Sequence, residues 1–358
     1  MVGPPTCHVC LVPVRAAYPQ TPYAQALKRP RLNSRVALAL LALAGLLALA
    51  VAARLLVGGT DQWDVLWPLR AQRVAGGIIA GSALAVAGVL LQGLLRNPLA
   101  SPDLLGMASG AGLGVMTAVL IASRAGTGLG AAGLGIAATG TAALVGALAA
   151  LALVYLLAQR KGLINPVSLV LIGVVVGVVC GAGMSVVQYL IPPGAKELAS
   201  RWSAGAIRDD LTWAQLLIAG AIVAAVSVAS FFSARTLDAA SLPDDEAASV
   251  GVVISRLRLF LFLSSGILAA TSVVIAGPIG FVGLICPHVV RLAAGPAHRT
   301  LVVGAALAGA ALVVWADVAV RLLDVQQGRL PLSVFTAIVG GPVLVLLLRR
   351  WARDQGTL

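Results

Sequence analysis

The chain has 358 residues, of which 59% are hydrophobic and 11% are charged, and its mean hydropathy is +0.99. A soluble domain carries about 25% charged residues, so this composition excludes a water-soluble globular protein and indicates an integral membrane protein. The net charge of +12 does not indicate a nucleic-acid-binding protein, because the basic residues are scattered among apolar runs instead of forming a patch interleaved with aromatic residues.

The first 35 residues are polar and contain Cys7, His8 and Cys10 in a C-x-x-C arrangement. A zinc site needs a second pair of ligands at suitable spacing, and the sequence offers none. We expect residues 1–35 to form a disordered cytoplasmic extension. They do not read as a signal peptide, because the apolar run that follows is long enough to span a membrane and many more come after it.

Apolar runs of about 20 residues, the length that crosses a bilayer, follow one another through the rest of the chain. We therefore expect an all-α, polytopic membrane protein with about ten transmembrane helices, the third and eighth being short or broken by glycine. The ten runs lie near 36–57, 74–95, 104–123, 134–158, 167–191, 213–233, 257–276, 279–294, 300–320 and 332–348.

The orientation follows from the basic residues of the connections. If the N-terminus is cytoplasmic, 16 of the 25 Lys and Arg residues lie on the cytoplasmic side and 9 lie outside, as the positive-inside rule requires. We expect both termini, including residues 351–358, to be cytoplasmic.

A polar connection with an arginine, an aspartate and two prolines separates the second and third runs. Because polar backbone needs water or protein partners, we expect this connection at a membrane boundary. Its sequence is Gln92-Gly93-Leu94-Leu95-Arg96-Asn97-Pro98-Leu99-Ala100-Ser101-Pro102-Asp103-Leu104-Leu105-Gly106.

The longest internal polar connection on the predicted cytoplasmic side, within residues 234–256, contains a short predicted helix. Ser241 is placed to cap its first turn, and Pro243 suits an early helical position. Three acids favour the positive end of the helix dipole, and Gly251 is placed to end the helix. From these residues alone, a solvated loop and a docking element for a soluble partner are equal alternatives. The segment reads Leu242-Pro243-Asp244-Asp245-Glu246-Ala247-Ala248-Ser249-Val250-Gly251.

Asp317 is the one acidic residue within the predicted spans, near the outer end of the ninth run. An intramembrane acid is the default proton or ion site, so an ion-coupled secondary transporter that uses Asp317 is the alternative function. Arg321 lies four residues later on the same helical face, which favours a local, structural ion pair. The sequence contains no Walker-type phosphate loop, catalytic triad or metal-ligand cluster, so we expect a chain that is not an enzyme and cannot hydrolyse ATP alone.

The Gln92–Gly106 segment carries a family signature together with Gly277-Pro278-Ile279-Gly280-Phe281-Val282-Gly283-Leu284-Ile285-Cys286-Pro287-His288. Shorter matches occur at Trp202–Gly205, Ala316–Arg321 and Leu330–Pro342. With these motifs the chain resembles, from about Leu66 to Arg350, the FecCD family of permease subunits in ABC importers for iron-siderophores, haem and cobalamin.

The resemblance implies an ABC importer type II permease fold over residues 36–350, in a bacterial cytoplasmic membrane. It also implies several partners: an identical or homologous permease protomer, two cytoplasmic ATPase subunits that bind ATP and Mg, and an extracytoplasmic substrate-binding protein. No cofactor is expected in this chain. The expected cargo is a metal chelate, most simply a ferric siderophore, with haem and cobalamin as alternatives.

The same resemblance implies roles for particular residues. Leu242–Gly251 would be the coupling helix seated in an ATPase subunit. Arg70, Arg73 and Arg321, all on the predicted outer side, would dock acidic residues of the binding protein. Asn165, Pro166, Trp202 and Ser203 would line the translocation path or its gate.

Overall fold

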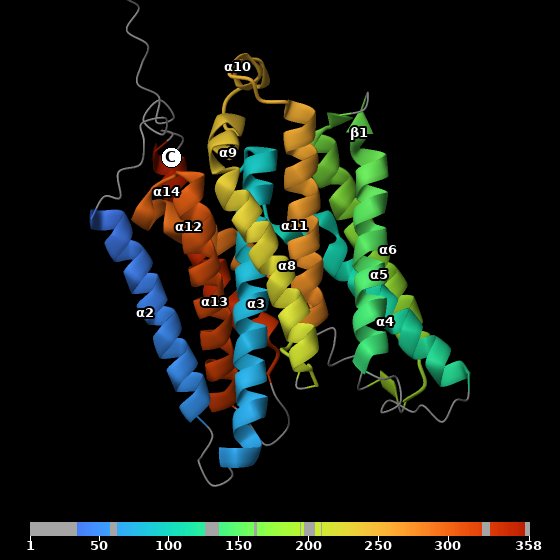
Figure 1. The fold of residues 1–358 in the computed structure, drawn as a ribbon. Helices are drawn as coiled ribbons and strands as arrows, with labels where there is room; N and C mark the ends of the chain where they lie inside the picture. The colour runs from blue at the N-terminus through green and yellow to red at the C-terminus, as the bar shows by residue number, and fades with distance from the viewer. Residues whose placement is uncertain are drawn as a thin grey trace, which may run out of the picture.

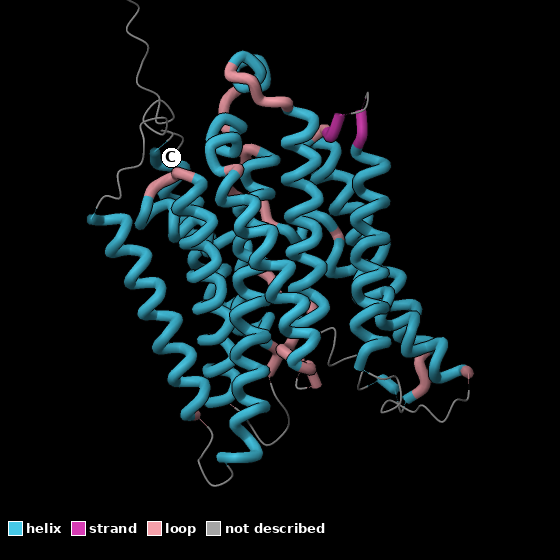
Figure 2. Tube along the Cα trace, in the orientation of Figure 1, coloured by secondary structure: helices cyan, strands magenta, loops and turns pink. Residues whose placement is uncertain are grey.

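A computed structural model describes residues 34–57, 63–125, 136–160, 163–193, 195–196, 205–208, 210–323 and 330–354. Within these residues the chain is almost entirely helical, as expected. The exception is an antiparallel pair of two-residue strands, β1 (Gln159–Arg160) and β2 (Leu163–Ile164), drawn in magenta in Figure 2. The predicted N-terminal extension lies outside the described residues up to position 33.

Ten long or apolar helices account for the ten predicted runs. Eight of them are long and apolar enough to cross a membrane, whereas α12 and the apolar part of α14, Leu332–Leu346, are shorter. The expected short eighth run is therefore the 13-residue α12, while the third run, α4, reaches 18 residues. The ten are α2 (Ser34–Leu56), α3 (Trp63–Leu95), α4 (Met107–Arg124), α5 (Ile136–Ala158), α6 (Pro166–Leu190), α8 (Trp213–Phe232), α11 (Ile254–Ala276), α12 (Val282–Ala294), α13 (His298–Leu322) and α14 (Leu332–Asp354).

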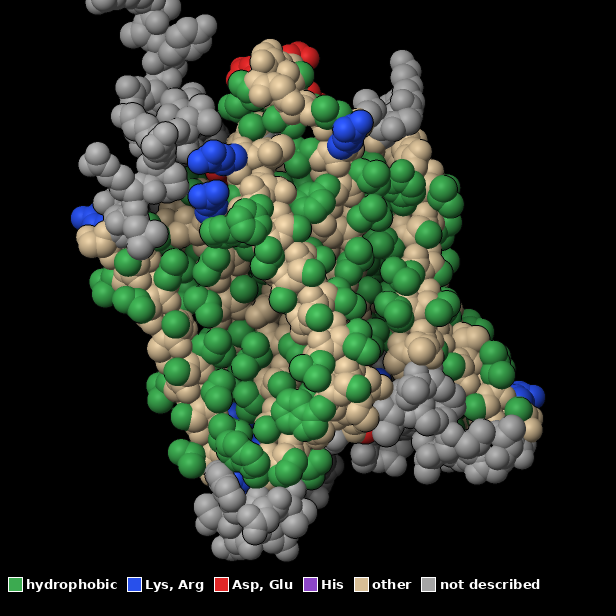
Figure 3. All heavy atoms as spheres, viewed as in Figure 1, with side chains coloured by type: hydrophobic (Ala, Val, Ile, Leu, Met, Phe, Trp, Pro, Cys, Tyr) green, Lys and Arg blue, Asp and Glu red, His purple; other side chains and the backbone are tan. Residues whose placement is uncertain are grey.

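The helices form an elongated bundle with two distinct ends (Figure 1). Two short helices, α9 (Ala234–Ala240) and α10 (Asp244–Ser249), lie at one end, and α10 projects beyond the bundle. The start of α2 and the end of α14 lie at this same end. Hydrophobic side chains cover the middle of the visible face, and charged side chains gather towards the ends (Figure 3). This distribution is that of a multi-pass membrane protein.

The core of the bundle consists of α3, α11 and α13. In the apolar 18-residue stretch of these helices, 78%, 67% and 72% of the residues are buried, respectively, against 6% in α2 and 11% in α6. Small residues allow these helices to approach closely, which is how membrane helices associate without a hydrophobic driving force. Gly81 of α3 and Gly309 of α13 lie backbone against backbone, and a Cβ on either would collide with the other's carbonyl group.

The two signature segments pack against each other inside the bundle. Gln92 donates a hydrogen bond from Nε2 to the carbonyl oxygen of Gly283 at 3.4 Å, and Pro102 lies directly against Gly283. Pro102 begins a short 3₁₀ helix, η1 (Pro102–Leu105). Gly106, at φ 69°, then turns the chain into α4 against Gly173 of α6.

The second half of Gln92–Gly106 does not stay at the end of the bundle, where the sequence alone would place the whole connection. Gly173 lies seven residues into α6, so the connection returns from the end of α3 into the bundle. Irregular backbone is tolerated at membrane depth where protein surrounds it, and Leu105 and Gly106 are buried here.

Candidate functional site

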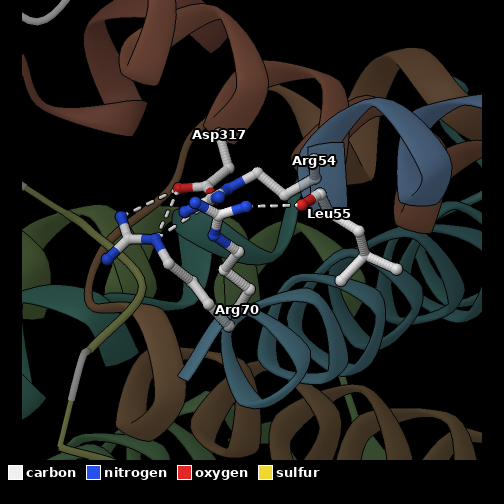
Figure 4. A network of polar contacts seen from close by, with 5 residues as sticks. Arg54, Leu55, Arg70 and Asp317 are labelled. Atoms are coloured by element: carbon white, nitrogen blue, oxygen red, sulfur yellow. Dashed lines mark hydrogen bonds and ion pairs between the residues drawn. The ribbon is translucent and has the colours of Figure 1, made fainter. Parts of the chain in front are cut away.

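A buried cluster of charged side chains lies at the end of the bundle opposite α10. The Asp317 carboxylate of α13 pairs with Arg54 of α2 and with Arg73 of α3, where Arg73 Nη2 lies 2.8 Å from Asp317 Oδ1. Arg70 of α3 donates from Nη1 to the Leu55 carbonyl oxygen at 2.8 Å (Figure 4). Asp317 is 2% exposed and the three arginines are 6–7% exposed. The cluster thus joins α13 to the consecutive helices α2 and α3, which are about 240 to 260 positions away in the sequence.

The local ion pair between Asp317 and Arg321 stays a prediction. Spacing along one helix identifies only neighbours on that helix, whereas two partners of Asp317, Arg54 and Arg73, lie 263 and 244 positions away. Arg54 was missed by sequence reasoning. The available signal was its place as the single charged residue in the last turn of α2, whose middle is apolar between Arg35 and Arg54. A charge there faces either protein or the membrane interface.

The burial of Arg70 and Arg73 also bears on their predicted docking role. Each is only 7% exposed, so neither presents its guanidinium group openly at the outer surface in this structure. The four charged groups of the cluster, Arg54, Arg70, Arg73 and Asp317, carry a formal net charge of +2. The cluster is therefore a buried, positively charged region near the end of the bundle opposite α10, which is the predicted outer end.

The predicted coupling helix is present as α10, with a different beginning from the one expected. The helix starts at Asp244 with Pro243 as its N-cap, and Ser241 instead ends α9 without capping α10. Proline at the cap fixes the backbone without a side-chain bond. Gly251, at φ 87°, ends the turn and donates its N–H to the Ala248 carbonyl oxygen at 2.9 Å.

Two acids fasten this segment, residues 234–251, to the long helices. Asp244 accepts a hydrogen bond from Arg96 Nη2 at 2.6 Å and another from Arg258 Nη2 at 2.8 Å. Asp238 of α9 accepts from the backbone N–H of His298 at 3.0 Å, and its Oδ1 lies 2.7 Å from His298 Nδ1. The segment is thus held at α3, α11 and α13.

The predicted gate residues at the start of α6 lie close to the same network. Asn165 is the N-cap of α6, and its Oδ1 accepts from the backbone N–H groups of Val167 and Ser168, both at 3.0 Å. Pro166 occupies the first helical position, where proline is favoured. Arg258 reaches this region by donating from Nη1 to the Ile164 carbonyl oxygen at 3.2 Å. The other two path residues predicted, Trp202 and Ser203, lie outside the described residues.

Comparison with known proteins identifies the architecture. The sequence model of the FecCD transport family matches residues 34–350. The chain belongs to the FecCD transport family. The match includes both the buried charged cluster and α10, and it ends four residues before the end of α14. As a FecCD permease, the chain is a transport subunit and not an enzyme.

Individual relatives agree with this assignment. The chain is 35% identical over 293 residues to the hemin transport system permease protein HmuU of Yersinia pestis, covering 82% of this chain and 85% of that protein. It is also 35% identical over 285 residues to the vitamin B12 import system permease protein BtuC of the same organism, covering 80% and 82%. The cobalamin import system permease protein BtuC of Halobacterium salinarum is 33% identical over 306 residues, covering 85% and 78%.

A solved structure shows the same fold. The chain of a metal-chelate type ABC transporter in an inward-facing conformation superposes with a TM-score of 0.76 at 28% identity. The match covers 88% of this chain and 99% of the solved chain. The fold of this FecCD permease is that of an ABC importer type II permease.

Proposed function

We propose that this FecCD permease forms the translocation path of an ABC importer that carries a metal chelate across a bacterial cytoplasmic membrane. The observation that carries the proposal is α10, a short acidic helix that projects from the end of an apolar bundle and is anchored to its long helices by Asp244. A helix fixed in this way suits transmission of force from a soluble partner. ATP and Mg would bind to two separate ATPase subunits seated against Leu242–Gly251.

A second permease protomer, identical or homologous, would complete the path. The exposed face of α6 supports this part of the proposal. Within one chain, only 11% of the residues in the apolar 18-residue stretch of this helix are buried. Val174, Val175, Val178 and Val179 are all at least 45% exposed on that helix. Asn165 and Pro166 would then stand at the cytoplasmic gate, with Trp202 and Ser203 further along the path.

The outer cluster would receive an extracytoplasmic binding protein. A region with net positive charge attracts carboxylates and orients an acidic partner before contact. In the described structure Asp317 holds Arg73, so docking carboxylates would have to compete with Asp317 for that guanidinium group. Arg321, which is partly exposed, would present the accessible guanidinium group of the docking surface. Arg70, which is 7% exposed, would have to leave its bond to the Leu55 carbonyl oxygen to take part.

The alternative, an ion-coupled transporter that uses Asp317, loses its main support. A coupling carboxylate has to meet the passing ion, whereas Asp317 is 2% exposed and already paired with two arginines. Its geometry is that of a structural counter-ion.

The names of the relatives bear on the choice of cargo. The sequence alone favoured a ferric siderophore, but the relatives quoted above are named for hemin and for vitamin B12 or cobalamin. We therefore propose a metal chelate as the class, with hemin and cobalamin as the first ligands to test and a ferric siderophore as the third.

The experiment that tests this function is an affinity purification of the permease from its native membrane, with the ATPase activity of the purified fraction as the measurement. A variant in which Gly-Ser residues replace Leu242–Gly251 serves as the matched control. We expect ATPase activity to co-purify with the wild type and to be lost with the variant. Absence of ATPase activity from a folded, monodisperse wild-type sample would overturn the proposal.

A further inference from the structure

Asp244 occupies a junction between three parts of the chain. It is the first residue of α10, and each of its two carboxylate oxygens has its own arginine: Oδ1 accepts from Arg96 and Oδ2 from Arg258. The next two acids, Asp245 and Glu246, are exposed, and no side-chain bond is described for either carboxylate within the described residues. Of the three acids, Asp244 is therefore the one that connects α10 to the membrane helices.

Arg258 extends this connection towards α6. One of its terminal nitrogens, Nη2, bonds Asp244 at 2.8 Å, and the other, Nη1, bonds the Ile164 carbonyl oxygen at 3.2 Å. Ile164 directly precedes Asn165, the N-cap of α6, and its backbone is held by the β1–β2 pair. The planar guanidinium group fixes the direction of both bonds, so a displacement of Asp244 is passed to the first turn of α6.

Arg96 forms the second branch of the junction. It follows the last residue of α3 with φ 48°, a backbone conformation that residues with a side chain rarely adopt. The conformation directs the chain into the Gln92–Gly106 segment, while the side chain bonds Asp244 at 2.6 Å. Both branches meet in a small cleft lined by Gly93, Leu94, Leu257 and the two arginines.

The other anchor of this segment has a different geometry. Asp238 bonds the first residue of α13 by both its backbone N–H and its imidazole, which fixes α9 against α13. Between the two anchors lies the short connection Ser241–Pro243. Movement of α10 relative to α9 would thus bend this connection and pull on Asp244.

We propose that Asp244 is the positioning residue that relays displacement of α10 to the cytoplasmic start of α6, through Arg258 and the Ile164 carbonyl group. The inference rests on the proposed function, because the displacement comes from an ATPase subunit bound at α10. Asp244 acts through its contacts with the permease itself, and Asp245 and Glu246 are left to face the partner.

The test uses the complete transporter, with its ATPase subunits, in proteoliposomes. The four native cysteines are replaced, and spin labels are placed at Leu38 and Val167, which are 70% and 69% exposed near the α10 end of α2 and α6. The distance between the labels is measured without nucleotide and after trapping with ATP and vanadate. This readout needs no transported ligand.

The variant is Asp244→Asn, and its control is Asp210→Asn, which removes the same charge from an exposed carboxylate just before α8, at the end of the bundle opposite α10. We expect Asp244→Asn to keep the bound ATPase and its hydrolysis of ATP while the nucleotide-dependent change in distance falls by about half or more. Asp210→Asn should keep the wild-type change. Arg258→Gln should reproduce the loss, and the double variant Asp244→Asn, Arg258→Gln should lose no more than either single variant, because both belong to one connection.

Three outcomes would overturn the relay. One is a wild-type change in distance for Asp244→Asn, and another is an equal loss for Asp210→Asn. The third is loss of the bound ATPase in Asp244→Asn, which would make Asp244 a docking residue. Failure of the proposed function is a separate result, because the wild type itself would then bind no ATPase.

Discussion

At the scale of single residues, the placement of charge decides how this chain is held together. Asp317 offsets two buried guanidinium groups, those of Arg54 and Arg73. Removing one partner of a buried ion pair leaves an uncompensated charge and destabilises a protein by about 3–5 kcal/mol. The Asp317 carboxylate is thus the group whose loss should affect the outer end of the bundle most.

We predict that Asp317→Asn lowers the apparent Tm of the purified permease in detergent by about 5 °C or more, because two arginines lose their counter-charge. Arg54→Gln should have a smaller effect, since Arg73 still neutralises Asp317. Thermal unfolding followed by size-exclusion chromatography gives the measurement, with the exposed Asp245→Asn as control. An unchanged Tm for Asp317→Asn would show that the cluster is not structural.

At this scale the sequence identifies the important acid but not its partners on other helices. Asp317 is recognisable because it is charged within an apolar run, and spacing along one helix gives only Arg321 as a candidate partner. Arg54 and Arg73 come from α2 and α3, and their approach to Asp317 depends on how the helices pack. For the same reason the sequence does not pair Asp244, one of the predicted coupling residues, with Arg96 or Arg258.

At the scale of the elements, run length and hydropathy predicted the helices well. The ten apolar runs correspond to ten helices, and the short helix in the 234–256 connection is present as α10. Run length could not predict that Pro102–Gly106 returns into the bundle against Gly283 and α6, because that depends on which glycines face one another. Glycines at 81, 88, 283 and 309 are spaced like many others in this chain, and only the packing distinguishes them.

The packing predicts opposite effects for the same substitution at two glycines. Gly81→Ala should destabilise the permease by about 1–3 kcal/mol, because the new Cβ meets the Gly309 carbonyl group. Gly45→Ala in α2 should leave stability unchanged or slightly raised, since nothing lies within 4 Å of that position and alanine favours a helix. Both variants are compared by apparent Tm in the same detergent. Equal effects at the two positions would show that the α3–α13 contact is looser than described.

At the scale of the whole molecule, the two ends differ in chemistry. One end carries α10 with its acids, together with the start of α2 and the end of α14 (Figure 1). The other end carries the buried arginine cluster (Figure 4). The excess of basic residues in the connections orients the first end towards the cytoplasm. That orientation is a prediction from charge, and the fold makes it testable at two well-separated positions.

Cysteine labelling measures this orientation. In a variant without the four native cysteines, Ser249→Cys on α10 should react with a membrane-impermeant maleimide only in inside-out vesicles. Arg124→Cys, at the opposite end of α4, should react only in right-side-out vesicles. Both residues are exposed in the described structure, so burial does not limit the reaction. The reverse labelling pattern would show that the permease has the opposite orientation, with α10 outside the cell.

The shortness of α12 has a consequence for biosynthesis. Its 13 residues extend about 20 Å, which is less than the hydrocarbon thickness of about 30 Å, so it cannot partition into lipid as an independent span. The irregular backbone before it, Gly277–Phe281, has to enter the membrane enclosed by protein. Its receiving surface on α3, around Leu84 and Gly88, has left the ribosome about 195 residues before Gly283. The order of synthesis thus presents one wall, made of α2 and α3, before α12 emerges, whereas the other wall, made of α13 and α14, follows it. We therefore expect α12 to enter the membrane together with α13.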